Sequence, residues 1–132
     1  MTRKEARDAA FKIMFESIFQ ADEMGELISR YYELFGEPGD QKEYLEGLVL
    51  ECANKKETLD AKISQYLANR PIGRISKVSL SVLRIAVYEI LYTDIANSVA
   101  INEAVELAKI YEGPKAGKFV NGVLASVVKE IA

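Results

Sequence analysis

Apolar residues recur at helical spacing from the start of the chain. In the first segment, small and apolar residues lie three or four positions apart and the pattern continues to Phe19; they are Ala6, Ala9, Ala10, Ile13, Met14 and Ser17. This spacing predicts an amphipathic helix that ends near Ala21 and Asp22, with basic residues on its other face. A second helix is predicted over roughly residues 25–35, because the Gly-Glu-Pro-Gly sequence at 36–39 is the clearest loop signal in the chain.

The next two helices are predicted on either side of residue 56. Asp40 has the position of an N-cap for a third helix that reaches about Lys56. A fourth helix is predicted from the apolar face that runs from Leu59 to Leu67. It should stop at the Asn-Arg-Pro sequence at 69–71, because the residue before a proline disfavours the helical conformation.

The second half of the chain contains the most apolar helical pattern. Apolar residues between Val78 and Leu91 predict a central helix. Another helix is predicted to open at Asn102 and Glu103, with Asn102 or Ser98 as its N-cap, and to close at residues 112–114. The sequence Lys-Phe-Val-Asn-Gly-Val-Leu then begins the last helix. No segment shows the alternation of a strand, so the chain is predicted to be an all-α bundle of about seven short helices, in a single domain spanning residues 1–132.

Gly122 interrupts the apolar pattern of this last helix. A glycine inside a helix costs roughly 1 kcal/mol relative to alanine, so some contact must offset that cost. We expect another helix to approach the bare backbone at Gly122 closely, with Asn121 at the edge of the contact.

Composition predicts a folded cytoplasmic protein. The 132 residues are 49% apolar and 28% charged with 3 prolines, which is typical of a globular chain. Cys52 is the only cysteine and the N-terminus has no apolar signal segment. The longest apolar run, residues 80–95, contains Arg84, Glu89 and Asp94, so no membrane span is expected.

The net charge of −3 hides a local excess of basic residues. Residues 2–12 contain four basic and two acidic side chains, and residues 114–118 contain two lysines and no acid. Arg3, Lys4 and Arg7 share one broad side of the first predicted helix, because positions three and four apart are neighbours on a helix surface. Such a patch is either ordinary solvated surface or a site for phosphates.

The sequence offers little for catalysis. It contains no histidine and no phosphate-binding loop, and Cys52 is interpreted as a small core residue. Glu103 lies where carboxylates complement a helix dipole, as does Glu106. Arg84 lies among apolar residues and is interpreted as an interior strut, paired with Glu89 or with one of these two glutamates. We therefore expect neither enzymatic activity, nor a metal site, nor a cofactor.

Several segments together resemble the NusB family of bacterial transcription antitermination factors. They are Ala-Arg-Asp-Ala-Ala-Phe-Lys-Ile-Met-Phe-Glu at 6–16, Gln-Tyr-Leu at 65–67, Val-Leu-Arg-Ile-Ala-Val-Tyr-Glu-Ile at 82–90, Val-Ala-Ile-Asn-Glu-Ala-Val-Glu-Leu-Ala-Lys-Ile-Tyr-Glu at 99–112 and the sequence at 118–124 already quoted. The resemblance covers essentially the whole chain. It implies an all-helical fold of two small bundles without catalytic activity. It also implies binding of the boxA element of nascent, chiefly ribosomal, RNA together with NusE, a protein of the small ribosomal subunit, and suppression of premature termination by RNA polymerase.

Carried over by position, the resemblance implies two binding surfaces. The RNA-facing residues would be Arg3, Lys4 and Arg7, with Lys115, Lys118 and Phe119 adjoining them. The surface for NusE would lie mainly around Ile75 to Ser79, with Phe15 at its margin. The chain departs from the family pattern at Glu5 within the basic start, at Arg70 where the family has tryptophan, at 78–80 where Val-Ser-Leu replaces Val-Asp-Arg, and in the Pro-Lys-Ala-Gly turn at 114–117.

Two alternatives remain at this stage. One is a protein-interaction module that binds no RNA. The other is a stand-alone relative of the N-terminal domain of cytosine-5 RNA methyltransferases, although the sequence after Gly122 has only ten residues and holds no methyl-donor domain or catalytic cysteine. The resemblance also leaves the oligomeric state open between monomer and homodimer, and a dimer could cover the basic first helix.

Overall fold

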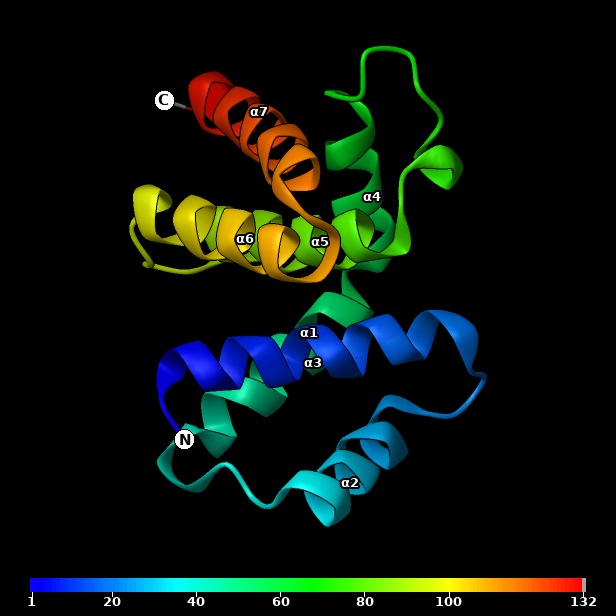
Figure 1. Cartoon of the computed structure of the whole chain (residues 1–132), viewed down its shortest axis with the longest axis vertical. Helices are drawn as coiled ribbons and strands as arrows, with labels where there is room; N and C mark the ends of the chain where they lie inside the picture. The colour runs from blue at the N-terminus through cyan, green and yellow to red at the C-terminus, as the bar shows by residue number, and fades with distance from the viewer. Residues whose placement is uncertain (132) are drawn as a thin grey trace. The chain divides into compact units, whose positions relative to one another are not determined.

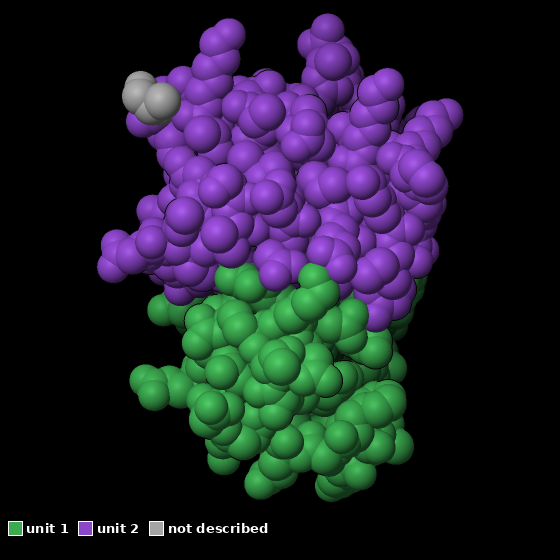
Figure 2. Space-filling model, turned by 60° about the vertical axis from the view of Figure 1, so that its left-hand side comes forward, with its two compact units in different colours: residues 1–54 green, residues 55–132 purple. Residues whose placement is uncertain are grey.

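The computed structural model describes residues 1–131, which form seven α-helices and two short 3-10 helices and contain no strand (Figure 1). The prediction of an all-α fold is confirmed. The elements are α1 Arg3–Phe19, α2 Met24–Phe35, η1 Gly39–Gln41, α3 Lys42–Asn54, α4 Lys56–Ser64, η2 Ile72–Arg74, α5 Lys77–Tyr92, α6 Asn97–Glu112 and α7 Pro114–Ile131. They fall into two compact units, Met1–Asn54 and Lys55–Ala132, drawn in different colours in Figure 2.

Unit 1 is built around α1, which packs against α2 and α3. Thr2 caps α1 with a capping box: its Oγ1 accepts a hydrogen bond from the backbone N–H of Glu5 over 3.1 Å, while its own N–H donates to Oε1 of Glu5 over 2.7 Å. Small side chains on the buried face of α1 let the other helices approach it. The core of the unit includes Ala6, Ala9, Ala10, Phe11, Ile13, Met14, Leu27, Ile28, Leu45, Leu48, Val49 and Cys52.

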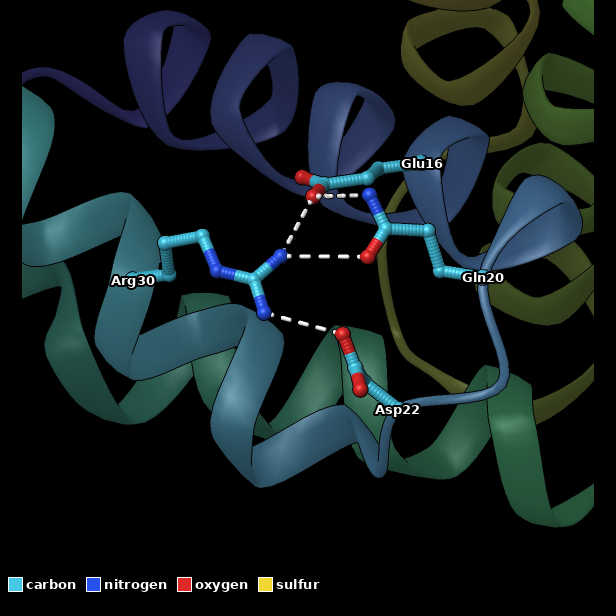
Figure 3. A network of polar contacts seen from close by, with 4 residues as sticks. All are labelled: Glu16, Gln20, Asp22 and Arg30. Atoms are coloured by element: carbon cyan, nitrogen blue, oxygen red, sulfur yellow. Dashed lines mark hydrogen bonds and ion pairs between the residues drawn. The ribbon is translucent and has the colours of Figure 1, made fainter.

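A polar network joins α2 to the end of α1 (Figure 3). Arg30 donates from Nη1 to Oε1 of Glu16 over 2.9 Å and to Oε1 of Gln20 over 3.2 Å, and from Nη2 to Oδ2 of Asp22 over 2.9 Å. Gln20 in turn donates from Nε2 to Glu16 over 3.0 Å. The hydrogen bond to Asp22 is the main cause of the raised pKa of Arg30. Because these side chains are exposed or half-buried, the network orients the turn between the helices and adds little stability.

Unit 2 is organised around α5, which packs against α4, α6 and α7. The first turn of α5 is capped by Ser76, whose Oγ accepts the backbone N–H of Ser79 over 3.0 Å. Arg84 lies on the buried part of α5, and its Nε and Nη2 donate to the two carboxylate oxygens of Asp60 over 2.7 and 2.8 Å. The interpretation of Arg84 as an interior strut is therefore confirmed, but its bidentate partner comes from α4 and was not among the three predicted glutamates.

Several helix ends differ from the predictions. Asp40 lies inside η1 and is not the N-cap of α3. α4 ends at Ser64, and the residues that follow include Ala68 and Asn69 in the left-handed region at φ 50° and 69°. α6 begins at Asn97 with Ala96 as N-cap, so neither Ser98 nor Asn102 caps it. In each case the residue that the local capping or stop signal marked is not where the helix begins or ends.

The prediction for Gly122 is wrong. A Cβ placed on Gly122 would meet no atom within 4 Å outside its own helix neighbourhood, and the residue is exposed, as is Asn121. The close approach occurs at Gly117 instead, where a Cβ would lie 2.6 Å from Cγ of Lys109. A side chain at position 122 would therefore cause no clash. Gly122 lowers the helix propensity of α7, and no packing contact explains its presence there.

Two other predictions concern the burial of the cysteine and the absence of a membrane-spanning helix. Cys52 is 1% exposed and belongs to the core of unit 1, as expected. Within residues 1–131, none of the helices combines the length and apolar character that crossing a membrane requires.

Candidate nucleic-acid interface

The start of α1 places Arg3 on the surface of unit 1 in a fixed position. The guanidinium of Arg3 lies 3.8 Å from the centroid of the Tyr44 ring, and its Nε donates to Oε1 of Gln41 over 2.7 Å. Both contacts come from the η1–α3 segment, so the long Arg3 side chain is held from two directions. Lys4 beside it is exposed.

Arg7 does not share this exposed position. It is 5% exposed, and its guanidinium carbon lies 5.6 Å from the centroid of the same Tyr44 ring. Residue 7 follows Arg3 by one turn and stands next to the buried Ala6, on the side of α1 that packs against α3. The expectation that Arg7 lies on an open helical face is therefore wrong.

Unit 2 contains a pocket that gathers four of the predicted site residues. Its volume is about 280 Å³, and it lies where the loop before α5 meets the end of α6 and the start of α7. The lining residues are Arg70, Arg74, Ile75, Ser76, Ser79, Glu112, Lys115, Ala116 and Phe119. Lys115 and Phe119 were predicted for RNA, and Ile75 and Ser79 for the protein partner, so the structure brings the two groups into one pocket.

The pocket combines an aromatic ring with an excess of positive charge. The half-buried Phe119 ring has the guanidinium of Arg70 5.2 Å from its centroid. Arg74 and Lys115 add two further cations, against the single carboxylate of Glu112. Oε1 of Glu112 accepts hydrogen bonds from Ser76 over 2.6 Å and from Ser79 over 3.4 Å. This carboxylate is hydrogen-bonded to hydroxyl groups, and the three cations of the pocket outnumber it. The pocket therefore attracts an anion.

The remaining predicted residues differ in exposure. Lys118 is exposed on α7. Ile75 and Ser79 are 4% and 3% exposed, so they shape the wall of the pocket and offer little area to a second protein. Phe15 is half-buried in unit 1, where its ring centroid lies 5.9 Å from that of Phe11 and 5.2 Å from that of Phe19.

Four residues of these surfaces were absent from the predicted site. Arg70 and Arg74 were missed because they lie in the segment between α4 and α5, Arg74 at the end of η2, although their spacing of four around Pro71 was a readable basic pair. Gln41 and Tyr44 gave no signal at all, because their contact with Arg3 spans 38 positions in the case of Gln41.

The described side chains form no candidate metal site. Among residues 1–131, no group of three or more histidine, cysteine, aspartate or glutamate side chains is placed to hold a metal ion.

Together, the helices and the basic, aromatic pocket define a small all-α protein with surfaces suited to a polyanion. A model of the NusB family matches residues 4–129. The chain belongs to the NusB family.

Individual relatives agree with this assignment over almost their full length. The chain is 40% identical over 131 residues to the transcription antitermination protein NusB of Listeria monocytogenes, covering 98% of both chains. It is 42% identical over 130 residues to the protein of the same name from Ruminiclostridium cellulolyticum, covering 98% of this chain and 90% of the relative.

Solved structures show the same fold. T. maritima NusB superposes with a TM-score of 0.90 at 32% identity, covering 98% of this chain and 92% of the other. A chain from the crystal structure of the antitermination factors NusB and NusE in complex with dsRNA superposes with a TM-score of 0.89 at 32% identity, covering 97% and 96%.

Proposed function

We propose that the protein is a transcription antitermination factor that binds boxA RNA of nascent transcripts, mainly ribosomal RNA, together with NusE. In this role it joins the elongating RNA polymerase complex and suppresses premature termination. Its family membership over residues 4–129 supports the proposal, as does the likeness to a chain from a crystal structure of NusB and NusE in complex with dsRNA. A factor of this kind acts in the bacterial cytoplasm, where transcription takes place.

The observation that carries the proposal is the pocket of unit 2. Single-stranded RNA is held by cations on its phosphates and by aromatic or guanidinium planes that stack on its bases. The pocket offers both: Phe119 with Arg70 supplies a stacking surface, and Arg74 and Lys115 supply cations at its edge. Lys118, exposed one turn after Lys115, extends the positive charge along α7.

On unit 1, Arg3 and Lys4 are proposed phosphate contacts. Arg7 supports this surface from beneath through the Tyr44 ring and does not itself reach the RNA. Phe15, Ile75 and Ser79 stay predicted NusE contacts; the two buried ones would act by fixing the shape of the surface that NusE meets.

The proposed activity is binding alone. The protein contributes no covalent step, and RNA and NusE are its ligands. The specificity of an RNA complex then depends on which bases enter the stacking pocket, while the phosphate contacts set the affinity and its salt dependence.

Fluorescence anisotropy with labelled boxA RNA tests the proposal. We expect weak binding by the protein alone, tighter binding with NusE, and a salt dependence that corresponds to about three to five phosphates. Lys118→Gln should weaken binding, whereas the matched control Lys129→Gln, at the other end of α7, should not. Equal affinity for boxA and scrambled RNA in the presence of NusE would contradict the proposal, and retention of NusE without any RNA affinity would favour a protein-only interaction module.

A further inference from the structure

Arg3 differs from an ordinary surface arginine because its guanidinium is already fixed. The ring of Tyr44 lies against it at 3.8 Å, and the carbonyl oxygen of Gln41 accepts its Nε–H over 2.7 Å. A free arginine side chain would lose much rotamer freedom on gripping a ligand. Arg3 has given up that freedom before any ligand arrives, so binding through it costs less entropy.

The contacts leave the binding edge of Arg3 available. A guanidinium has five N–H donors in one plane, and Gln41 uses only the donor on Nε. In the part of the chain that the structure describes, no side chain or backbone group accepts from the Nη1 and Nη2 groups of Arg3. These two groups form the fork that pairs with two oxygens of a phosphate, and the residue is exposed.

Arg7 lies near the same Tyr44 ring as Arg3. Its buried guanidinium lies 5.6 Å from the centroid of the Tyr44 ring, so the ring has cations from two successive turns of α1 near it. The half-buried ring is thereby fixed between α1 and α3, and it presents Arg3 at a defined place on the surface.

We propose that Tyr44 and Gln41 are positioning residues for RNA binding, and that the Arg3 guanidinium they hold receives a phosphodiester group of single-stranded RNA through Nη1 and Nη2. The inference rests on the proposed function and deepens it, because it assigns one phosphate contact and the two residues that prepare it. Neither positioning residue touches the RNA. Each acts only through Arg3.

The competing possibility is that Arg3, Tyr44 and Gln41 merely staple α1 to α3. If the three residues only hold α1 against α3, substituting them lowers the stability of unit 1 and does not change the RNA affinity of the variants that stay folded. A positioning role affects RNA affinity through Arg3, so its effect disappears when Arg3 is already absent. A double-mutant cycle separates the two.

The experiment measures boxA RNA affinity of the full chain with NusE at several salt concentrations. Arg3→Gln should weaken binding about tenfold, which is the loss expected for one hydrogen-bonded charge. It should also reduce the magnitude of the slope of log K against log salt by about 0.7, the value for one phosphate of a single strand. Tyr44→Leu and Gln41→Ala should produce smaller losses in the same direction, and Tyr44→Phe, which keeps the ring, should bind as wild type.

The decisive comparison is made in the Arg3→Gln background. There we expect Tyr44→Leu and Gln41→Ala to cause no further loss of affinity. Full additivity would overturn the positioning role, as would wild-type affinity and salt slope in both folded single variants. Gln41→Ala provides the answer if Tyr44→Leu proves too unstable. If the wild-type protein with NusE binds boxA RNA no better than scrambled RNA, the proposed function itself fails. If the wild-type protein prefers boxA RNA but the Tyr44 and Gln41 variants bind it with wild-type affinity, only the positioning role fails.

Discussion

The side chain of Lys109 lies across the backbone of Gly117. A Cβ at position 117 would come within 2.6 Å of Cγ, 3.4 Å of Cδ and 3.2 Å of Cε of the lysine, so three methylene groups of the α6 side chain run over the first turns of α7. Only Gly113 separates the two helices in sequence. Gly117 therefore leaves room for a side chain of α6 to lie against the backbone of α7, a close approach that the sequence had suggested for Gly122.

Gly117→Ala should destabilise the fold because the new methyl group collides with the near end of the Lys109 side chain. We expect a loss of about 1–2 kcal/mol in the free energy of unfolding, measured with urea. In the Lys109→Ala background the collision is gone, so the same substitution should become neutral or stabilising by up to about 1 kcal/mol. Gly122→Ala is the matched control on the same helix: with open space around it, it should stabilise by up to about 1 kcal/mol. Equal effects at both glycines would contradict this account.

Asp60→Asn should destabilise unit 2 strongly. The substitution removes the charge that the buried guanidinium of Arg84 needs, and breaking one side of such a pair costs about 3 kcal/mol or more. The double variant Asp60→Leu with Arg84→Met removes both charges and should recover much of the loss. Thermal and urea unfolding of the three proteins provide the measurement, and a double variant less stable than Asp60→Asn would contradict the assignment of a paired strut.

Arg7→Glu should lower stability and should not act as a clean RNA-binding variant. It places a carboxylate at a position that is 5% exposed, where an unpaired charge costs several kcal/mol. Arg7→Met keeps the apolar stem and should fold with a smaller loss. Melting temperature and RNA affinity are compared in both variants: a stable Arg7→Met protein that loses more affinity than Arg3→Gln would show that Arg7 contacts RNA directly, because a role through Arg3 cannot exceed the loss of Arg3 itself.

The capping box of α1 should make stability depend on pH. Hydrogen bonds from the backbone and side chain of Thr2 lower the pKa of Glu5 from its ordinary value of 4.5. Because the pKa is depressed in the folded state, this stabilisation is present above that value and disappears as the pH falls through the lower folded pKa. Glu5→Gln keeps a side-chain acceptor but cannot titrate. We expect its melting temperature to fall less than that of wild type on acidification, and parallel curves would refute the contribution.

Much of the fold was predictable because helix periodicity is a local property. The spacing of Ala6, Ala10 and Ile13 marked the buried face of α1, and the apolar run of α5 marked the central helix. Helix ends were less predictable: α6 begins at Asn97 with no capping side chain, and Asp40, the expected cap, lies inside η1, so capping residues alone did not mark these ends.

The candidate site was predictable only where a side chain's role is visible locally. Lys118 and Arg3 could be placed on the surface from charge and spacing. The burial of Arg7 could not, because it depends on contacts with residues far away in the sequence, among them Tyr44. Gly122 gave the same kind of false signal: a glycine within an apolar pattern indicates either a close crossing or nothing, and sequence does not distinguish them.

Transcription readthrough is the most direct test of the function assigned to this protein. The measurement is the fraction of transcripts that pass a terminator placed after a boxA-containing leader, in a bacterial extract depleted of its own NusB and supplied with NusE. Addition of the wild-type protein should raise readthrough on this template and leave a scrambled-boxA template unchanged, and Arg3→Gln combined with Lys118→Gln should reduce the effect. The account would be contradicted if the folded wild-type protein left readthrough unchanged, or raised it equally on both templates.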